Sequence, residues 1–274
     1  KLIAPKIEKE FVDGFDYVIE QLRASQDYTD VASDMEISKA VYFLKKKDPK
    51  KAKETLEAIQ KKDKKLHDAT TLSRAATNLC FIHSLEGNYR EADEYGTEAI
   101  RADRYNAKAL VNKANCEIYK AQAAEERDQL QNARDLYLEA KNLYMEGIGV
   151  EADCVEAIFN LGLCCRRMAD LERTIGENHN YVSYILAALQ AFEKLRSIMP
   201  DSADCIWNIA TICDELDAFY ASGPEGVPST TVQYLKKASS SYKALVALVK
   251  TDAAVLARYG ALLARDDDES QAFT

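Results

Sequence analysis

The stretch Val155-Glu-Ala-Ile-Phe-Asn-Leu-Gly-Leu-Cys-Cys165 places apolar residues three and four positions apart, with a glycine within the apolar face. This spacing predicts a helix with one buried face, and the glycine would let a second helix approach closely. The second helix is expected around Ala188, Phe192 and Leu195, where the apolar period resumes. Together the two segments predict a helical hairpin.

A small residue in one helix and an alanine at the head of the next recur six times along the 274 residues. The pattern resembles the tetratricopeptide repeat (TPR), whose hairpins bury their apolar faces only by stacking on one another. We therefore predict an all-α, TPR-like right-handed superhelix of stacked hairpins. The predicted packing pairs are Ala40 with Ala52, Cys80 with Ala92, Ala114 with Ala133, Gly162 with Ala188, Ala210 with Ala238, and Gly260 with Ala272.

The hairpins are unequal in length. The alanines of the last two lie 34 residues apart, as in a plain TPR, whereas the earlier intervals are 40, 41, 55 and 50 residues. The additional residues lie between the paired positions of the three middle hairpins. About seven residues make two helical turns, so we expect extended middle hairpins with longer helices. The third extension includes 223–228, Gly-Pro-Glu-Gly-Val-Pro, which is typical of a loop.

Residues 1–32 are predicted to form an N-terminal helical cap or partial repeat, and residues 33–274 an array of about six hairpins with the last one truncated. Helix starts are indicated by Asp48-Pro49 and by three capping-box patterns. These patterns are Ser33-x-x-Glu36, Asp153-x-x-Glu156 and Asp268-x-x-Gln271. Because the chain begins with Lys1 and no methionine, we expect it to be part of a longer protein.

An asparagine recurs at the sixth position of four successive first helices, and the set is Asn78, Asn112, Asn160 and Asn208. An amide both donates and accepts, so these side chains could bind the backbone of a peptide on the inner wall. The alternative is that they bond neighbouring helices to one another. Trp207, next to Asn208, could line the same wall or belong to the core.

Charge is distributed unevenly. The formal net charge is −9, which disfavours nucleic-acid binding, yet residues 45–65 hold ten lysines against four acids. This lysine cluster could contact an acidic partner, or it could be a solvated helix face. The longest apolar run, 244–249, is far too short to span a membrane, so no membrane insertion is expected.

The cysteines and histidines, which are common catalytic residues in enzymes, form no catalytic pattern in this sequence. The seven cysteines contain no Cys-x-x-Cys pair and are expected to be buried free thiols. His67, His83 and His179 belong to no Ser/His/Asp or Cys/His arrangement. We predict no catalytic, cofactor-binding or metal-binding residues and no enzymatic activity.

Several segments outside the general TPR pattern carry a more specific resemblance. They are 3–8 with 14–16, 36–44, 75–79, Asp103-Arg-Tyr-Asn106 with Asn112-Lys113, 156–162 and 270–273. In this order the chain resembles the large, Polaris-type TPR subunit of the intraflagellar transport complex B core. The resemblance is least secure at the extended middle hairpins.

The resemblance implies a non-enzymatic scaffold that binds other complex-B core subunits through extended or helical segments in its groove. It also implies a place in the cilium or flagellum and basal body, on the reducing, cytoplasmic side, and a role in assembly and maintenance of cilia. Two alternatives stay open. One is another TPR adaptor or co-chaperone for peptide tails, although Thr77, Val111, Phe159 and Trp207 are not the basic residues that a carboxylate clamp needs. The other is a helical accessory region of a larger enzyme.

Overall fold

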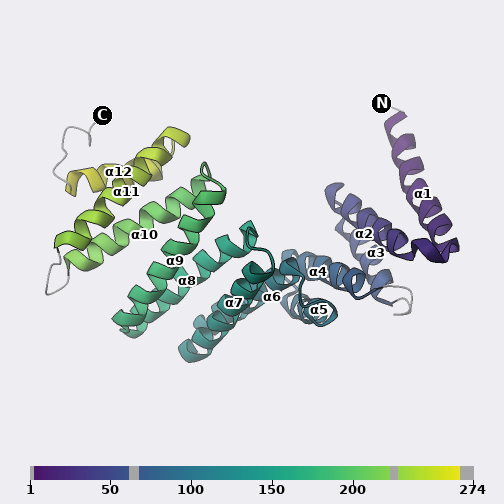
Figure 1. Ribbon diagram of the computed structural model, residues 1–274, viewed down its shortest axis with the longest axis horizontal. Coiled ribbons are helices and arrows are strands. Elements are labelled where there is room, and N and C mark those ends of the chain that lie inside the picture. The colour runs from purple at the N-terminus through teal and green to yellow at the C-terminus, as the bar shows by residue number, and fades with distance from the viewer. Residues whose placement is uncertain (1–2, 62–67, 223–227, 266–274) are drawn as a thin grey trace. The chain divides into compact units, whose positions relative to one another are not determined.

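The computed structural model describes residues 3–61, 68–222 and 228–265. These ranges contain twelve α-helices and one short 3-10 helix, Gln26–Tyr28. The α-helices are labelled in Figure 1. The α-helices are α1 Ile3–Ala24, α2 Thr29–Lys45, α3 Pro49–Lys61, α4 Ala69–Leu85, α5 Tyr89–Ala102, α6 Ala107–Glu125, α7 Leu130–Val150, α8 Val155–Ile175, α9 Asn178–Ile198, α10 Ala203–Ala221, α11 Pro228–Leu248 and α12 Ala253–Arg265.

The chain divides into two compact units, Lys1–Ala152 and Asp153–Thr274. In the N-terminal unit, α1 packs on α2, and three hairpins follow: α2–α3, α4–α5 and α6–α7. The first helices of these hairpins, α2, α4 and α6, also contact one another in order. In the C-terminal unit the hairpins are α8–α9 and α10–α11, with α12 against α11. The predicted all-α, TPR-like fold class is confirmed.

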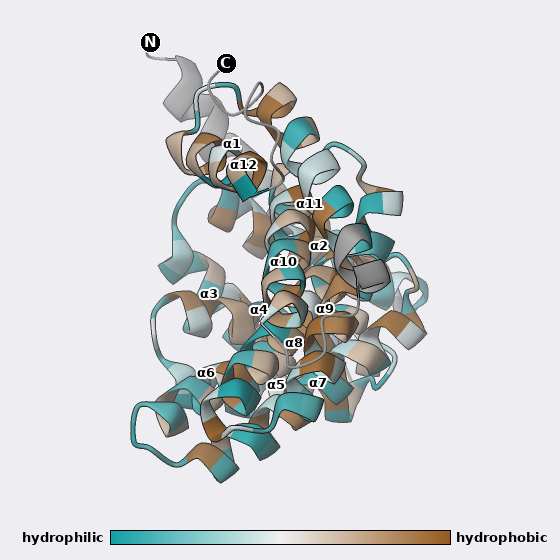
Figure 2. Cartoon of the chain, turned by 90° about the vertical axis from the view of Figure 1, so that its left-hand side faces the viewer, coloured by the Kyte–Doolittle hydropathy of each residue, from teal (hydrophilic) through white to brown (hydrophobic). Residues whose placement is uncertain are grey.

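Most of the predicted small residues are buried within the described helices. Ten of the twelve are buried, while Gly260 is half-buried and Ala272 lies outside the described residues. Gly162 shows why a small residue is needed, because a Cβ there would lie only 2.7 Å from the Phe192 ring. Each helix carries both hydrophobic and hydrophilic residues (Figure 2), so burial of one face holds the stack together.

The extended hairpins have longer helices, as expected. Helices α6 to α11 have 19 to 21 residues, whereas α2 to α5 have 13 to 17. The predicted loop at 223–228 lies outside the described residues except for Pro228, which begins α11. Extra residues added in whole turns lengthen a helix while its apolar face keeps its direction.

The predicted helix starts are partly wrong. Asp48 does accept a hydrogen bond from the Lys51 backbone N–H at 3.2 Å, as a cap should. Ser33, however, lies inside α2 and donates to the Thr29 carbonyl at 3.0 Å. The helix begins at Thr29 because this extra turn buries Ala32 completely. The capping box from Ser33 to Glu36 is therefore not formed, and Glu36 instead pairs with Arg23 of α1 at 2.6 Å.

The second capping box is also not formed. The residue before α8 is the buried Cys154, one position later than the predicted Asp153, and its side chain makes no capping hydrogen bond. The third pattern, from Asp268 to Gln271, lies outside the described residues. The predicted division between residues 32 and 33 falls within α2. An N-terminal cap followed by an array stays a prediction.

Candidate protein-interaction surface

In the N-terminal unit, asparagine side chains join the first helices of neighbouring hairpins. Asn112 of α6 donates from Nδ2 to the Thr77 carbonyl of α4 at 3.1 Å. Asn78 instead donates to the Arg74 carbonyl of its own helix at 2.8 Å. Both are half-buried. The hydrogen bond from Asn112 is of the kind expected if the asparagines join neighbouring helices to one another. A bound peptide would compete with the Thr77 carbonyl for the Asn112 amide.

Asn106 strengthens the same junction and was not singled out from the sequence as a site residue. Its Oδ1 accepts from the Ala109 N–H at 3.2 Å and so caps α6. Its Nδ2 donates to Ser73 Oγ at 2.9 Å and to Thr77 Oγ1 at 3.1 Å. One side chain therefore caps its own helix and bonds the preceding hairpin.

In the C-terminal unit, a single arginine joins α8 to α10. The Arg166 guanidinium donates to Asn208 Oδ1 and Thr211 Oγ1, each at 3.0 Å, and to Glu215 Oε1 at 2.7 Å. Asn208 also donates to the Asp204 carbonyl at 2.8 Å, so both ends of its amide are bonded. Burial raises the pKa of Glu215 and outweighs the opposing attraction of Arg166.

Asn160, also half-buried, has bonding partners of its own within the chain. The four asparagines thus recur along the first helices as predicted, but they do not share one bonding pattern. Their role in peptide binding stays a prediction.

Trp207 is half-buried on α10 and lies at the rim of a small cavity. Its ring meets Tyr242 edge-to-face at 6.2 Å between centroids, and the Arg258 guanidinium lies over it at 5.5 Å. The cavity has a volume of about 290 Å³ and is also lined by Leu245 and Val255 from the following helices. Trp207 therefore packs against the core on one side and borders an open recess on the other.

A group of charged side chains is partly buried between α5 and α6. Lys113 bonds Glu117 at 2.7 Å and also Asp93, while Lys120 bonds the same two carboxylates at 2.8 Å from Asp93 and 3.0 Å from Glu117. Burial raises the pKa of Asp93, but its bonds to the two lysines outweigh burial and the net pKa is lowered. Burial likewise lowers the pKa of Lys113, yet its carboxylate partners make the net shift upward. These charges are compensated structural contacts.

In the ranges that the structure describes, the thiols are buried and the two histidines lie in different surroundings. All seven cysteines are buried and free, as expected, and Cys80 and Cys116 have their sulfurs 3.9 Å apart. His83 is buried and stacks on Tyr95 at 5.4 Å, whereas His179 is exposed and His67 lies outside the described residues. Within the described part of the chain, no group of three metal-ligating side chains is placed to hold an ion.

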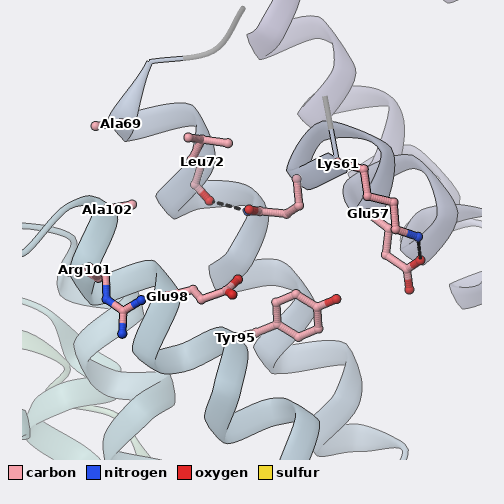
Figure 3. Close-up of a pocket in the computed structure, with 9 residues that line it drawn as sticks. Glu57, Lys61, Ala69, Leu72, Tyr95, Glu98, Arg101 and Ala102 are labelled. Carbon is pink, nitrogen blue, oxygen red and sulfur yellow. Dashed lines mark hydrogen bonds and ion pairs between the residues drawn. The ribbon is translucent and has the colours of Figure 1, made fainter. Parts of the chain in front are cut away.

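A recess with a volume of about 570 Å³ lies between α3, α4 and α5. Figure 3 shows the side chains that line it. Glu57 and Lys61 approach it from α3, and Glu98 and Arg101 from α5. Glu57 already pairs with Lys61 at 3.0 Å, and Gln60 bonds the Leu72 carbonyl at 2.7 Å. A lining with both charges, partly paired, does not select a small ligand of either sign. Among the described helices, none is both long and apolar enough to cross a membrane.

The stacked helical hairpins have the TPR fold. Solved TPR structures share the fold: one from Parabacteroides merdae has a TM-score of 0.50 with 17% identity, over 88% of this chain and 75% of that one. A thermophilic TPR protein from Thermus thermophilus has a TM-score of 0.50 with 14% identity, over 85% of this chain and 99% of that one. No family model matches the chain.

A curated human protein, the intraflagellar transport protein 88 homolog, is 42% identical to this chain over 106 residues. That alignment covers 39% of this chain and 12% of the human protein, so the chain matches about an eighth of its relative. The resemblance predicted from the sequence is thereby confirmed: the chain has the TPR fold, and 106 of its residues are similar to part of the human intraflagellar transport protein.

Proposed function

We propose that this chain is a non-enzymatic scaffold of the intraflagellar transport complex B, which binds other core subunits during the assembly and maintenance of cilia or flagella. The observation that carries the proposal is the 42% identity over 106 residues to the human intraflagellar transport protein on a stacked-hairpin fold. Stacked hairpins leave the faces of the first helices available to extended or helical partner segments. Its place would be the cilium and basal body.

The physical features of the chain agree with a scaffold. The cysteines are buried, the charged side chains between α5 and α6 are paired, and the described recesses hold no convergent set of reactive groups. Long rigid helices provide binding surface without chemistry. A co-chaperone clamp for peptide carboxylates is less well supported, because Thr77 and Val111 are buried and uncharged.

The direct test is affinity purification of the chain from ciliated cells, followed by quantitative mass spectrometry. We expect several complex-B core subunits to be enriched together. Recovery of chaperones alone would contradict the proposal.

A second experiment tests the asparagines as peptide ligands. Replacing Asn112 and Asn160 together with alanine should weaken partner binding while the helical circular dichroism stays intact. Unchanged binding with a lowered melting temperature would instead assign both residues to the stack.

A further inference from the structure

The ends of the first two hairpins carry a feature that the structural contacts do not use. Three lysines, Lys45, Lys47 and Lys50, are exposed around the α2–α3 turn. Residues 45–51 contain five lysines and one aspartate, a local net charge of +4 in a chain of net charge −9. Nearby, Phe81 and Leu85 lie on one face of α4, 47% and 72% exposed. We call these five residues the tip patch.

Lys45 of α2 and Leu85 of α4 lie at corresponding places because the two helices pack against each other in register. Arg74 of α4 pairs with Asp34 of α2. Lys45 and Leu85 each follow these residues by eleven positions, which is three helical turns, so they occupy equivalent places. The Lys53–Glu86 pair, at 2.7 Å, joins the two hairpins at the same end.

The apolar half of the tip patch continues toward α6. Tyr89, at the start of α5, stacks on Tyr119 of α6 with 4.4 Å between ring centroids. Tyr89 is 46% exposed, so one of its sides is available beyond this stack. The one acid next to Leu85, Glu86, is already paired with Lys53, so the strip lies beside a local excess of positive charge. An exposed apolar strip with a charged border is characteristic of a protein-binding site.

The backbone adds an independent observation. Lys47 has φ 60°, in the left-handed region that favours glycine, and it closes α2 through a bond from its N–H to the Leu44 carbonyl at 2.9 Å. The equivalent position after α4 is Gly87, with φ 77° and the matching bond to Ser84. A lysine therefore stands where glycine would be less strained, and Asp128, with φ 58°, takes the same conformation after α6. This turn geometry fixes the Lys47 backbone in place at the end of α2.

We infer that the tip patch binds an acidic, amphipathic segment of a partner protein. Apolar side chains of the partner segment would cover Phe81 and Leu85. Carboxylates of the same segment would face Lys45, Lys47 and Lys50. The positive charge of the tip patch favours an acidic partner segment. The exposed apolar pair, Phe81 and Leu85, requires that this segment also carry apolar side chains. This inference rests on the proposed scaffold function and specifies one site and one partner chemistry for it.

The experiment uses a fluorescent probe peptide of about 18 residues with leucines on one helical face and glutamates on the other. Two comparison peptides replace all glutamates with lysines or all leucines with glutamates. Fluorescence anisotropy at low and physiological salt gives the dissociation constants for the full chain. We expect the leucine/glutamate probe to bind at least about ten-fold more tightly than either comparison peptide, and more weakly as salt rises.

Matched variants locate the site. K45E/K47E/K50E and Leu85→Ser should each weaken probe binding about ten-fold or more. The controls are K194E/K243E/K250E, which makes the same charge change at exposed lysines of the C-terminal unit, and Leu138→Ser at an exposed leucine of α7. Circular dichroism checks that all variants are folded. Equal weakening by the control variants, or equal binding of a comparison peptide, would overturn the inference.

A parallel affinity purification separates the two proposals. If the wild-type chain recovers complex-B core subunits but the tip-patch variants bind the probe normally, only the tip patch is wrong. If the wild-type chain recovers none, the scaffold function fails whatever the probe does.

Discussion

The two compact units stack their first helices by different means. In the N-terminal unit the contact between α4 and α6 includes neutral bonds from Asn106 and Asn112 to Thr77 and Ser73, spread over two side chains. In the C-terminal unit the polar contact between α8 and α10 is centred on Arg166. The same repeat geometry therefore tolerates either several weak contacts or one charged contact. The stability of the C-terminal unit, which depends on the one charged contact, should therefore be far more sensitive to a single substitution.

The largest effect is expected at Arg166. Arg166→Ala removes three hydrogen bonds and takes the ion-pair partner away from the partly buried carboxylate of Glu215, so we expect a loss of about 3 kcal/mol in the free energy of unfolding. Chemical denaturation followed by circular dichroism measures it. The adjacent, exposed Arg167→Ala is the control and should change stability by less than about 0.5 kcal/mol. Similar small effects for both would show that Arg166 does not hold the stack.

The next effect concerns the close approach of α8 and α9. Gly162→Ala should cost about 2 kcal/mol, because the new methyl group would meet the Phe192 ring. The matched control, Gly149→Ala in α7, has open space around it and should gain up to about 1 kcal/mol from helix propensity. Thermal and urea unfolding of both variants checks the opposite signs. Stabilisation by Gly162→Ala would contradict the packing.

A smaller effect is expected from pH in the N-terminal unit. The pKa of Asp93 is lowered in the folded chain, so its stabilisation is present above the unfolded pKa of about 3.9 and is lost as pH falls through the folded value. Asp93→Asn should remove about 1 kcal/mol at pH 7, allowing for its partial exposure, and should flatten the decline in stability below about pH 4. Asp135→Asn, on the exposed side of α7, is the control. If the stability of Asp93→Asn fell below about pH 4 as steeply as that of the wild-type chain, the charged group between α5 and α6 would contribute nothing to the pH dependence.

The smallest effect compares the two hairpin turns. Lys47→Gly should stabilise the chain by about 0.5 to 1 kcal/mol, because glycine adopts the left-handed conformation without strain. Gly87→Lys at the equivalent turn should destabilise it by about the same amount. Differential scanning calorimetry on both variants measures the shifts. Shifts of the melting temperature in the same direction and of equal size for both variants would show that the Lys47 backbone is not strained.

Much of the fold follows from the sequence because short-range periodicity encodes it. The glycine at 162 and the alanine at 188 predicted a close helix pair, and the longer intervals predicted longer helices in the middle hairpins. Helix starts were harder, since Ser33 has the chemistry of a cap but burial of Ala32 extends α2 past it.

The contacts between hairpins were the least predictable part. Arg166 and Glu215 lie 49 residues apart, and no local pattern marks them as partners. Asn106 could have been recognised as a cap before an apolar run, but its bonds to Ser73 and Thr77 depend on the stacking register. The tip patch was visible only as a lysine cluster, because the exposure of Leu85 is a property of the folded hairpin.

The scaffold function is tested most directly by mixing the purified chain with purified complex-B core subunits and separating them by size-exclusion chromatography with light scattering. We expect a stable complex in which the chain elutes earlier, together with at least one core subunit, at a mass equal to the sum of the components. Separate elution of the chain and every core subunit, at concentrations well above about 1 micromolar, the scale of a −8 kcal/mol interaction, would contradict it.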